Sequence, residues 1–300
     1  MRALLFSLLC AIFGIASAAP PPTADSAGAL QAKYAELHSE LGNNAFGRPL
    51  HLDSKESSSE VMGDAYAVLD HPFAKAGAAL AQPASWCEIL LLPFNTKQCN
   101  VVRAGDQAVT LDVRIGRKNE ESADQAYPVA FKYHVASSTA DFLQVKLDAD
   151  QGPLSTRDYR IVLEATPLKD GRTFLHLAYS YGFGLSGRLA MQTFLNTVGA
   201  GKVGFSVLDK RADGEPRYID GMRGVVERNT MRYYLAIEAF LGAVGAPYQQ
   251  RTEKAARDWF AATERYRRQL HEMEEEQYLA MKRREYSRQA QAGRGTAPGT

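Results

Sequence analysis

The sequence predicts an α+β protein in which a curved antiparallel sheet is closed by a long helix toward the C-terminus. Three observations support this prediction. Between Val109 and Tyr181, five segments alternate apolar with polar residues, as half-buried strands do. Short turns such as Gly152-Pro153 join them, and short links favour antiparallel neighbours. The helical segment Asn229–Val244 is apolar on two sides, so it must be covered on both.

The chain begins with the pattern of a secretory signal peptide, Met1–Ala18. Arg2 provides the basic start, Ala3–Ile15 is an apolar stretch of 13 residues, and Ala16-Ser17-Ala18 fits the small-x-small cleavage rule. The alternative is an N-terminal membrane anchor, but a bilayer span needs about 20 residues. We therefore expect an exported protein, periplasmic or extracellular, with no transmembrane segment in the mature chain.

Export permits disulfides. Removal of the signal peptide takes Cys10 away and leaves Cys87 and Cys99. We expect these two to form a structural disulfide that closes a loop of about 13 residues and contributes about 3 kcal/mol in the chain-entropy model. The alternatives are two free buried thiols or a catalytic redox pair. Eleven intervening residues match the C-x-x-C spacing of oxidoreductases poorly.

The first third of the mature chain is expected to hold a spacer, helices and two strands. A Pro-rich spacer precedes a helix that Gly42-Asn43-Asn44 ends. Pro83 is expected to break a later helical stretch into two short helices. These elements are the spacer Ala19–Ser26, the helix Ala27–Leu41, the strands Pro49–Asp53 and Glu60–Asp70, and the helical stretch Pro72–Leu91.

The middle of the chain supplies the sheet. The alternating segments are Val109–Ile115, Val129–Val135, Leu143–Asp148, Tyr159–Glu164 and Leu175–Tyr181. They are followed by a helix near Ser186–Val198, a strand near Lys202–Leu208, a possible strand Tyr218–Val226, and the closing helix Asn229–Val244, which Pro247 ends.

The C-terminal segment Gln249–Gln289 is predicted to be one long charged helix. Between Arg251 and Arg288 it carries ten basic and eight acidic residues. Five residues make a weak apolar stripe: Ala255, Trp259, Ala262, Tyr266 and Met273. The helix is either a coiled-coil arm that binds a protein partner or a helix that packs its stripe on the domain. We favour packing, because the stripe is poor in Leu and Ile. The tail Gln291–Thr300 is expected to be disordered.

Composition excludes one large class of function. Hydrophobic residues are 45% and charged residues 23% of the chain, as in ordinary globular proteins. Without Arg2, Lys plus Arg and Asp plus Glu both number 34. Such an even balance lacks the basic surface that nucleic-acid binding needs, so no nucleic-acid partner is expected.

One motif resembles a cofactor site. Gly182–Gly187 matches G-x-G-x-x-G after a strand, and Asp209 follows 22 residues later, as in dinucleotide-binding folds. The preceding strands alternate like antiparallel sheet rather than parallel sheet, and no further βαβ units surround the motif. An exported protein would also meet little nicotinamide cofactor. We therefore expect a tight strand-to-helix turn and no cofactor.

Metal and catalytic motifs are lacking. No close pair or H-E-x-x-H is found among the histidines, which are His38, His51, His71, His134, His176 and His271. No G-x-S-x-G nucleophile elbow is found either, so no catalytic residue and no metal ligand is assigned. We interpret His134 and His176, on the polar sides of their strands, as solvent-facing or hydrogen-bonded rather than as general bases.

Aromatic side chains point to a ligand cavity. If the helices hold a curved sheet without filling it, the space beneath them is mostly apolar with a few polar groups. Glu238 would be its polar anchor, because a carboxylate on an apolar helix side is costly unless paired. The candidate ligand-binding residues are Phe131, Tyr133, Tyr159, Tyr179 and Tyr181 from the sheet, with Tyr234, Glu238 and Leu241 from the helix. The alternative is ordinary core packing, with Glu238 at a rim or bridged to Arg160.

The order of elements resembles a known superfamily. A strand, Glu60–Leu69, precedes Asp70-His71-Pro72-Phe73, then short helices to Trp86-Cys87-Glu88-Ile89-Leu90, a long antiparallel meander and a major helix. This order is similar to the START-like helix-grip superfamily, also called SRPBCC, which includes lipid-transfer domains and polyketide cyclases. The resemblance covers about Glu60–Val244. It implies a helix-grip fold with a hydrophobic ligand in a tunnel between sheet and closing helix. It implies no catalytic residue, because the superfamily has no universal catalytic motif.

The chain departs from this pattern at both ends and once inside. The helix near Ser186–Val198 is an insertion, and the helices before residue 60 and after residue 246 are additions. The expected organisation is therefore a signal peptide (1–18), an N-terminal spacer, helix and lead-in strand (19–59), a START-like domain (60–246), a long charged helix (247–289) and a tail (290–300).

Three functions fit these expectations. The first is an exported protein that binds or carries a hydrophobic, lipid-like molecule without covalent chemistry. The second is an enzyme on the same fold, such as a cyclase, hydratase or hydrolase, which would need polar groups of perturbed ionisation in the tunnel, with Glu238 beside a Tyr or His. The third is an interaction module that uses the C-terminal helix. The first is our prediction.

Overall fold

The computed structural model describes residues 26–104, 108–197 and 199–295. The predicted signal peptide Met1–Ala18 and most of the Pro-rich spacer lie outside the described residues, as do residues 296–300 of the predicted tail. Residues 291–295, which the sequence placed in that tail, are instead the last residues of a helix.

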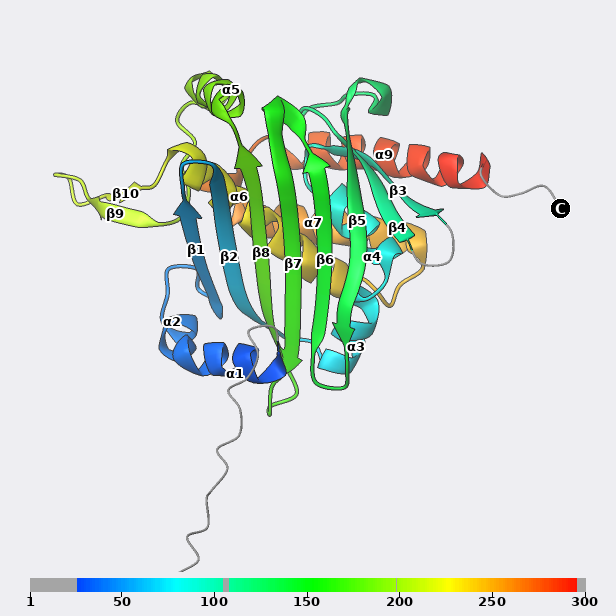
Figure 1. Ribbon diagram of the computed structural model, residues 1–300, viewed down its shortest axis with the longest axis horizontal. Coiled ribbons are helices and arrows are strands. Elements are labelled where there is room, and N and C mark those ends of the chain that lie inside the picture. Colours follow the sequence, from blue (N-terminus) through cyan, green and yellow to red (C-terminus); the bar gives the residue numbers. More distant parts are fainter. Residues whose placement is uncertain (1–25, 105–107, 198, 296–300) are drawn as a thin grey trace, which may run out of the picture.

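One large sheet organises the chain. Its eight strands follow the order β1-β2-β8-β7-β6-β5-β4-β3, and all neighbours are antiparallel (Figure 1). The strands are β1 (Leu50–Glu56), β2 (Glu60–Leu69), β3 (Thr96–Ala104), β4 (Ala108–Ile115), β5 (Tyr127–Ser138), β6 (Leu143–Gln151), β7 (Thr156–Pro167) and β8 (Thr173–Phe183). Between β2 and β3 the chain crosses to the other edge of the sheet through two short helices, α3 (Phe73–Leu80) and α4 (Pro83–Leu91). The break at Pro83 and the five central strands are confirmed.

Strand β3 is missing from the sequence prediction. A register irregularity between Thr96 and Gln98 interrupts its alternation. Lys97, a residue expected outside, is fully buried there, whereas Val102 is exposed. Because the apolar period is broken, the segment lacks the signal by which the other strands were found.

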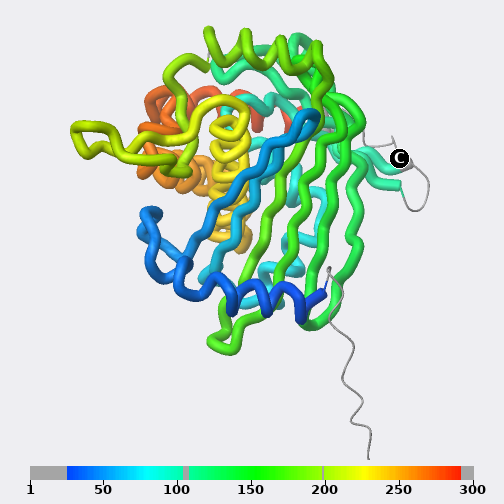
Figure 2. Tube along the Cα trace, turned by 60° about the vertical axis from the view of Figure 1, so that its left-hand side comes forward, coloured from blue at the N-terminus to red at the C-terminus, as the bar shows by residue number. Residues whose placement is uncertain are grey.

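Helices cover the two faces of the sheet differently. The long helix α6 (Gly221–Leu241) packs on the inner face against β1, β2 and β8, and α4 packs beside it against β3 and β4. On the outer face, α1 (Ala27–Glu36) crosses β7 and β8, followed by the short α2 (His38–Gly42) (Figures 1 and 2). A curved antiparallel sheet closed by a long helix is the helix-grip architecture that the sequence predicted.

Helix α6 begins eight residues before the predicted Asn229. The possible strand Tyr218–Val226 is wrong: only β10 (Pro216–Tyr218) is extended, and the helix includes both valines after it. Tertiary packing overrides their β-propensity, because Val226 is fully buried against the sheet. The helix approaches β2 most closely at Gly63, where an added Cβ would lie 2.5 Å from Thr230 Oγ1.

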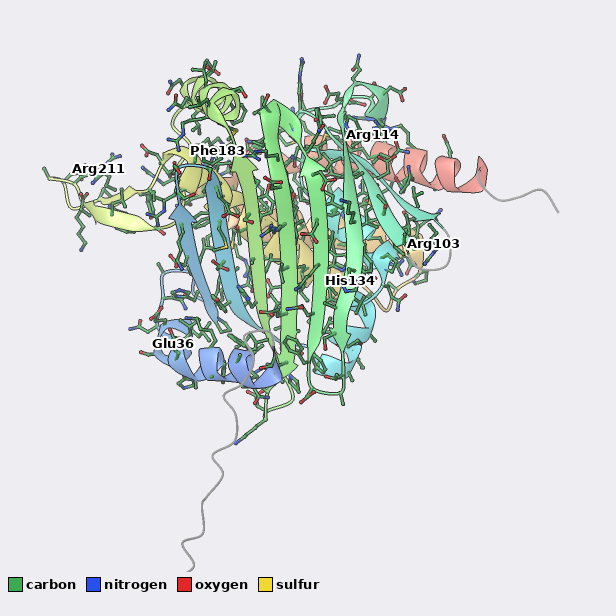
Figure 3. All side chains as sticks on the ribbon, in the orientation of Figure 1. Glu36, Arg103, Arg114, His134, Phe183 and Arg211 are labelled. Carbon is green, nitrogen blue, oxygen red and sulfur yellow. A yellow bond between two sulfur atoms is a disulfide. The ribbon has the colours of Figure 1, made fainter. Side chains whose placement is uncertain are left out.

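The insertion after β8 forms a helix and a small hairpin. Helix α5 (Leu185–Asn196) confirms the prediction for Ser186–Val198, of which Val198 lies outside the described residues. The glycine motif that precedes it leaves an antiparallel strand, as expected for a strand-to-helix turn. Strands β9 (Val207–Lys210) and β10 then form a hairpin whose turn, around Arg211, extends away from the sheet (Figure 3).

The predicted single helix Gln249–Gln289 is three helices. They are α7 (Tyr248–Glu264), α8 (Arg267–Leu270) and α9 (Glu275–Gly295), and α9 folds back along α7 and reaches β3. The chain turns at Tyr266 and again at His271, where the backbone leaves the helical region. Folding back buries Trp259 completely, with its indole N–H donating to the carbonyl of Arg232 at 3.0 Å. The apolar stripe therefore packs on the domain; a protein partner for this segment stays a prediction.

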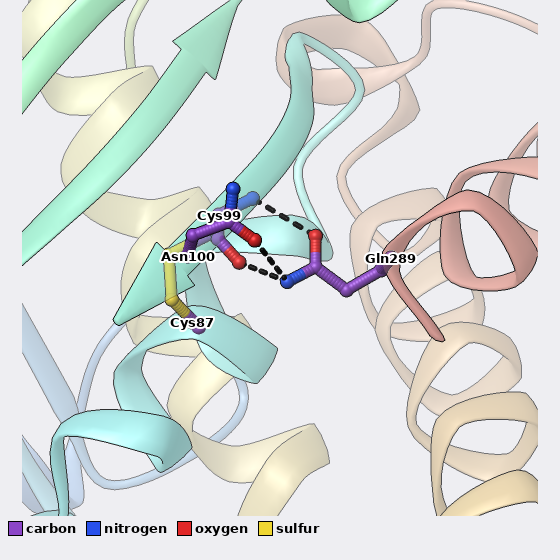
Figure 4. Close-up of a disulfide and its surroundings, with 4 residues drawn as sticks. All are labelled: Cys87, Cys99, Asn100 and Gln289. Atoms are coloured by element: carbon purple, nitrogen blue, oxygen red, sulfur yellow. Dashed lines mark hydrogen bonds between the residues drawn. A yellow bond between two sulfur atoms is a disulfide. The ribbon is translucent and has the colours of Figure 1, made fainter. Parts of the chain in front are cut away.

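The predicted disulfide is present. Cys87 on α4 is bonded to Cys99 on β3, with their Cα atoms 5.2 Å apart. Figure 4 shows that Gln289 of α9 binds the same point: its Oε1 accepts from the backbone N–H of Cys99 at 3.2 Å, and its Nε2 donates to Asn100 Oδ1 at 3.2 Å. Helices α4 and α9 are thus both attached to the edge strand. Among the described residues, no helix has the length and apolar character required to cross a membrane.

Candidate functional site

The five candidate residues on the sheet share its inner face. Tyr133 and Tyr179 lie in one row that runs across β5, β6, β7 and β8, and Phe131, Tyr159 and Tyr181 lie in the next. Side chains two residues apart on a strand point to the same side, which is why the alternation placed them correctly. Together with Tyr233 of α6 we call these residues the tyrosine cluster.

Five rings of the tyrosine cluster, all except that of Tyr133, pack against one another. Tyr159 stacks on Tyr181 at 5.3 Å and meets Phe131 edge-on at 6.5 Å. Tyr179 meets Tyr233 of α6 edge-on at 5.3 Å, so the cluster joins the sheet to the closing helix. Gly152 allows the Tyr159 ring to lie against the backbone, because an added Cβ would come within 2.3 Å of that ring.

Two hydroxyls of the cluster are buried with no hydrogen-bond partner among the described residues. These are the Oη atoms of Tyr133 and Tyr181, whereas Tyr159 Oη is 2.6 Å from Thr156 Oγ1. Burial raises the pKa of Tyr159 to about 12 and raises the pKa values of Tyr133 and Tyr181 further. The phenols are therefore neutral at physiological pH and can donate hydrogen bonds.

The polar helix candidates face a different part of the molecule. Glu238 pairs with Arg48, which precedes β1, and the Arg48 guanidinium lies over the ring of Tyr234 at 5.2 Å. Arg160, the partner considered from sequence, lies instead 4.0 Å from Asp148. The partner of Glu238 is 190 residues away in sequence, so only the fold could identify it. Leu241 is buried in the core.

A cavity of about 400 Å³ lies near this pair. Its aromatic lining includes Phe46, Phe205 and Tyr266, whose rings lie 5.6–6.2 Å from one another. Tyr266 donates from its hydroxyl to the carbonyl of Phe46 at 3.2 Å. Most of the lining comes from the loop before β1, the loop before β9 and the segment from the end of α7 into α8, with Leu52 of β1 and Tyr218 of β10 beside them. Sequence reasoning missed this cavity, because no local pattern connects those segments.

A cluster of four cations lies beside the tyrosine cluster. It consists of Arg228 and Arg232 on α6, Lys118 from the loop after β4 and Lys202 from the loop after α5, with Glu272 among them. We call it the basic cluster. Glu272 Oε1 accepts from both Lys118 Nζ and Arg232 at 2.6 Å, and Lys202 Nζ lies 3.5 Å from Oε2.

The electrostatics of the basic cluster reflect its excess of positive charge. Burial and the charge of Arg232 lower the pKa of Lys118 to about 8. Burial alone would raise the pKa of Glu272, but Arg232 and Lys118 hold it below its usual value. The only sequence signal for this cluster was two arginines one turn apart on a helix that is apolar on two sides.

On the outer face, a histidine lies between two carboxylates. His176 Nε2 is 2.8 Å from Asp64 Oδ1 and its Nδ1 is 2.9 Å from Glu164 Oε2, and its ring stacks on Tyr66 at 4.2 Å. His134 is exposed on the same face (Figure 3). Hydrogen-bonded and solvent-facing histidines were the sequence interpretation, and both are confirmed. Within the described ranges, no three His, Cys, Asp or Glu side chains are grouped to hold a metal ion.

This arrangement predicts a pH-dependent loss of stability for His176→Gln. Burial alone would lower the pKa of His176, but Asp64 and Glu164 outweigh it and raise the pKa. The stabilisation that protonated His176 gains from these two carboxylates is therefore fully present below its unfolded pKa of about 6.5. It is lost as pH rises through the pKa of His176 in the folded protein. We expect H176Q to lower the free energy of unfolding by about 2 kcal/mol at pH 6, the range for hydrogen bonds to charged groups, and by less at pH 9. Urea denaturation checks this, with His134→Gln as the exposed control. An equal loss at both pH values would contradict it.

Comparisons with known proteins find distant structural likeness only. No protein-family model matches the chain, and no curated protein matches it. Among solved structures, a conserved protein from Geobacillus kaustophilus is 18% identical with a TM-score of 0.32, covering 46% of this chain and 84% of that one. Human StAR-related lipid transfer protein 5 is 9% identical with a TM-score of 0.30, covering 53% and 83%. The human StarD13 (DLC2) lipid transfer and protein localization domain is 12% identical with a TM-score of 0.29, covering 53% and 88%. The helix-grip assignment rests on the strand order and the position of α6.

Proposed function

We propose that this protein binds and carries a hydrophobic, lipid-like molecule between the inner face of the sheet and α6, without covalent chemistry. The observation that carries the proposal is the pair of hydroxyls of Tyr133 and Tyr181, which are buried among aromatic side chains with no hydrogen-bond partner among the described residues. A buried hydroxyl without a partner costs about 1–3 kcal/mol. A ligand with an apolar body and a hydrogen-bonding group could pack on the aromatic rings and pair with one of these hydroxyls, as is usual for small-molecule sites.

Entry of the ligand requires the rings to move. The rings of Phe131, Tyr159, Tyr179, Tyr181 and Tyr233 pack against one another with centroids 5.3–6.5 Å apart, so a ligand can enter between them only if they move. We place the ligand among these rings, which turn about their side-chain bonds to admit it.

The export that the signal-peptide pattern predicts is part of the same proposal, with a mature chain that begins at Ala19 in the periplasm or outside the cell. Intact mass of the protein recovered from that compartment would test the cleavage site.

Binding is better supported than the enzyme alternative. The tyrosines have raised pKa values, so none supplies a base at neutral pH. The carboxylate suggested for catalysis, Glu238, does lie beside a tyrosine, Tyr234, but it is neutralised by Arg48 and lies away from the tyrosine cluster.

A single-atom change tests the proposal. We expect Tyr181→Phe to weaken the binding of dodecanol about 5–10-fold, because one hydrogen bond of about 1 kcal/mol is lost. The same change should leave the thermal stability of the free protein unchanged or slightly higher, because the hydroxyl has no protein partner to lose. Calorimetric titration with dodecanol and thermal melting measure the two effects.

The matched control is Tyr248→Phe on α7, whose side chain is 39% exposed and not part of the tyrosine cluster. Tyr248→Phe should change neither the affinity for dodecanol nor the thermal stability of the free protein.

Organic extraction of protein purified from cells should also release a co-purifying lipid. Protein that is free of lipid and has no affinity for dodecanol would refute the proposal.

A further inference from the structure

We infer that the basic cluster binds the anionic head group, a carboxylate or a phosphate, of the molecule whose apolar part lies in the tyrosine cluster. This inference rests on the proposed function and names the chemical class of its ligand: an anionic amphiphile.

The first support is a charge imbalance. Glu272 is the carboxylate that pairs with Lys118, Lys202 and Arg232, and Arg228 lies close enough to add its charge. Arg232 and Glu272 are both largely buried, at 8% and 9% side-chain exposure. The buried carboxylate of Glu227 also acts on Arg228. Two carboxylates cannot neutralise four cations, and buried charges are normally paired. A bound anion would correct the imbalance.

The second support is the set of unused donors. Arg228 is 3% exposed and donates from one guanidinium nitrogen to the carbonyl of Val203 at 3.1 Å. No carboxylate of a described residue lies within 4 Å of its guanidinium nitrogens. Nε of Arg232 is buried and has no hydrogen-bond partner in the part of the chain that the structure describes. A guanidinium offers five N–H donors, and its preferred acceptors are the paired oxygens of carboxylates and phosphates.

The third support is continuity with the tyrosine cluster. Arg228 and Arg232 are one turn apart on α6. Helix α6 packs against β8, the strand that carries Tyr179 and Tyr181. Tyr233, the residue after Arg232, meets the ring of Tyr179 at 5.3 Å. The arginines and the aromatic rings are therefore neighbours where α6 packs on the sheet.

The cluster is also reachable from solvent. The side chains of Lys118 and Lys202 are 33% and 27% exposed, whereas those of the arginines are buried. A head group would meet the lysines first and the arginines next, with its chain directed toward the tyrosines. The excess of positive charge would also attract anions.

Three ligands with the same twelve-carbon chain test the inference: laurate, dodecyl phosphate and dodecanol. We expect at least one of the anions to bind wild-type protein about 10-fold or more tightly than dodecanol, because only the anions can pair with the buried guanidinium groups. A preference between laurate and dodecyl phosphate identifies the head group. Equal affinity for all three would overturn the inference and leave the proposed function intact, whereas failure of all three to bind would overturn both.

Variants assign the effect to these residues. Lys118→Gln and Lys202→Gln, both partly exposed, should each weaken the preferred anion about 5–20-fold and leave dodecanol unchanged. Glu272→Gln should tighten anion binding, because it removes the competing carboxylate. Lys132→Gln, a lysine on the outer face that is 68% exposed and paired with Asp150, is the matched control. Anion binding that is unaffected by K118Q, K202Q and E272Q would show that the head group lies elsewhere.

Discussion

Replacing Glu285 with glutamine is expected to lower the free energy of unfolding by about 3–5 kcal/mol at pH 7, the usual result of breaking a buried ion pair. Glu285 on α9 is almost fully buried between two buried lysines. Its Oε1 is 3.2 Å from Lys97 Nζ of β3, and its Oε2 is 2.7 Å from Lys282 Nζ of its own helix. Without this carboxylate, two cations would remain in the interior with no opposite charge.

Each lysine also donates hydrogen bonds to backbone carbonyls. Neither these carbonyls nor a neutral glutamine can supply the negative charge of Glu285. Lys97 Nζ donates to the carbonyls of Phe94 and Asn119, and Lys282 Nζ donates to those of Pro93 and Thr96. These bonds hold α9 against the loop between α4 and β3. We therefore expect E285Q to weaken the attachment of the C-terminal helix first.

The pH dependence of this loss has a definite sign. Burial lowers the pKa of Lys282 to about 8, although Glu285 partly opposes the shift. A lysine with a lowered folded pKa costs stability while it is protonated, and that cost is relieved as pH rises from about 8 toward the unfolded value of about 10.4. In E285Q the pKa falls further, so the deficit relative to wild type should shrink between pH 7 and pH 9.

Urea denaturation at the two pH values measures this deficit. Glu276→Gln, an exposed residue on the same helix, should cost less than about 0.5 kcal/mol at both. The prediction fails if E285Q costs no more than this control, or if its deficit does not depend on pH.

Removing the disulfide is expected to cost about 3 kcal/mol. In the chain-entropy model, a bond that closes a loop of about 13 residues restricts the unfolded chain by this amount. The double variant Cys87→Ala, Cys99→Ala should show the loss in urea denaturation, and wild-type protein treated with a phosphine reductant should approach the same midpoint. The reductant should not affect the double variant, which serves as its own control. An unchanged midpoint after complete reduction, verified by thiol titration, would contradict the expectation.

Local periodicity explains why much of the fold was predictable. Alternation over Val129–Val135 and Leu175–Tyr181 indicates which side chains share a face of each strand. In the folded sheet those side chains lie on that same face. The five sheet residues of the tyrosine cluster follow from such alternation directly, whereas its helix residue is Tyr233 and the sequence had suggested Tyr234. The disulfide was predictable for a related reason, because the predicted export and the two cysteines left after it favour their pairing without reference to shape.

Where periodicity fails, the prediction fails. The irregularity near Thr96 conceals β3, and the valines at 225 and 226 suggested a strand where burial against β2 stabilises α6. The charge pattern over Gln249–Gln289 could not reveal the turns at Tyr266 and His271. These turns bring α9 back against α7 and β3, and no local charge pattern records that packing.

The amino-acid order alone determined the strands of the meander, the face on which their aromatic residues lie and the cysteine pair, because each depends on spacing along the chain. Only the tertiary structure decided that Arg48 neutralises Glu238 and that Lys118, Lys202, Arg228 and Arg232 surround Glu272. Such contacts join segments up to 190 residues apart, and their electrostatic energy depends on distance and burial in space, which no local pattern in a sequence records.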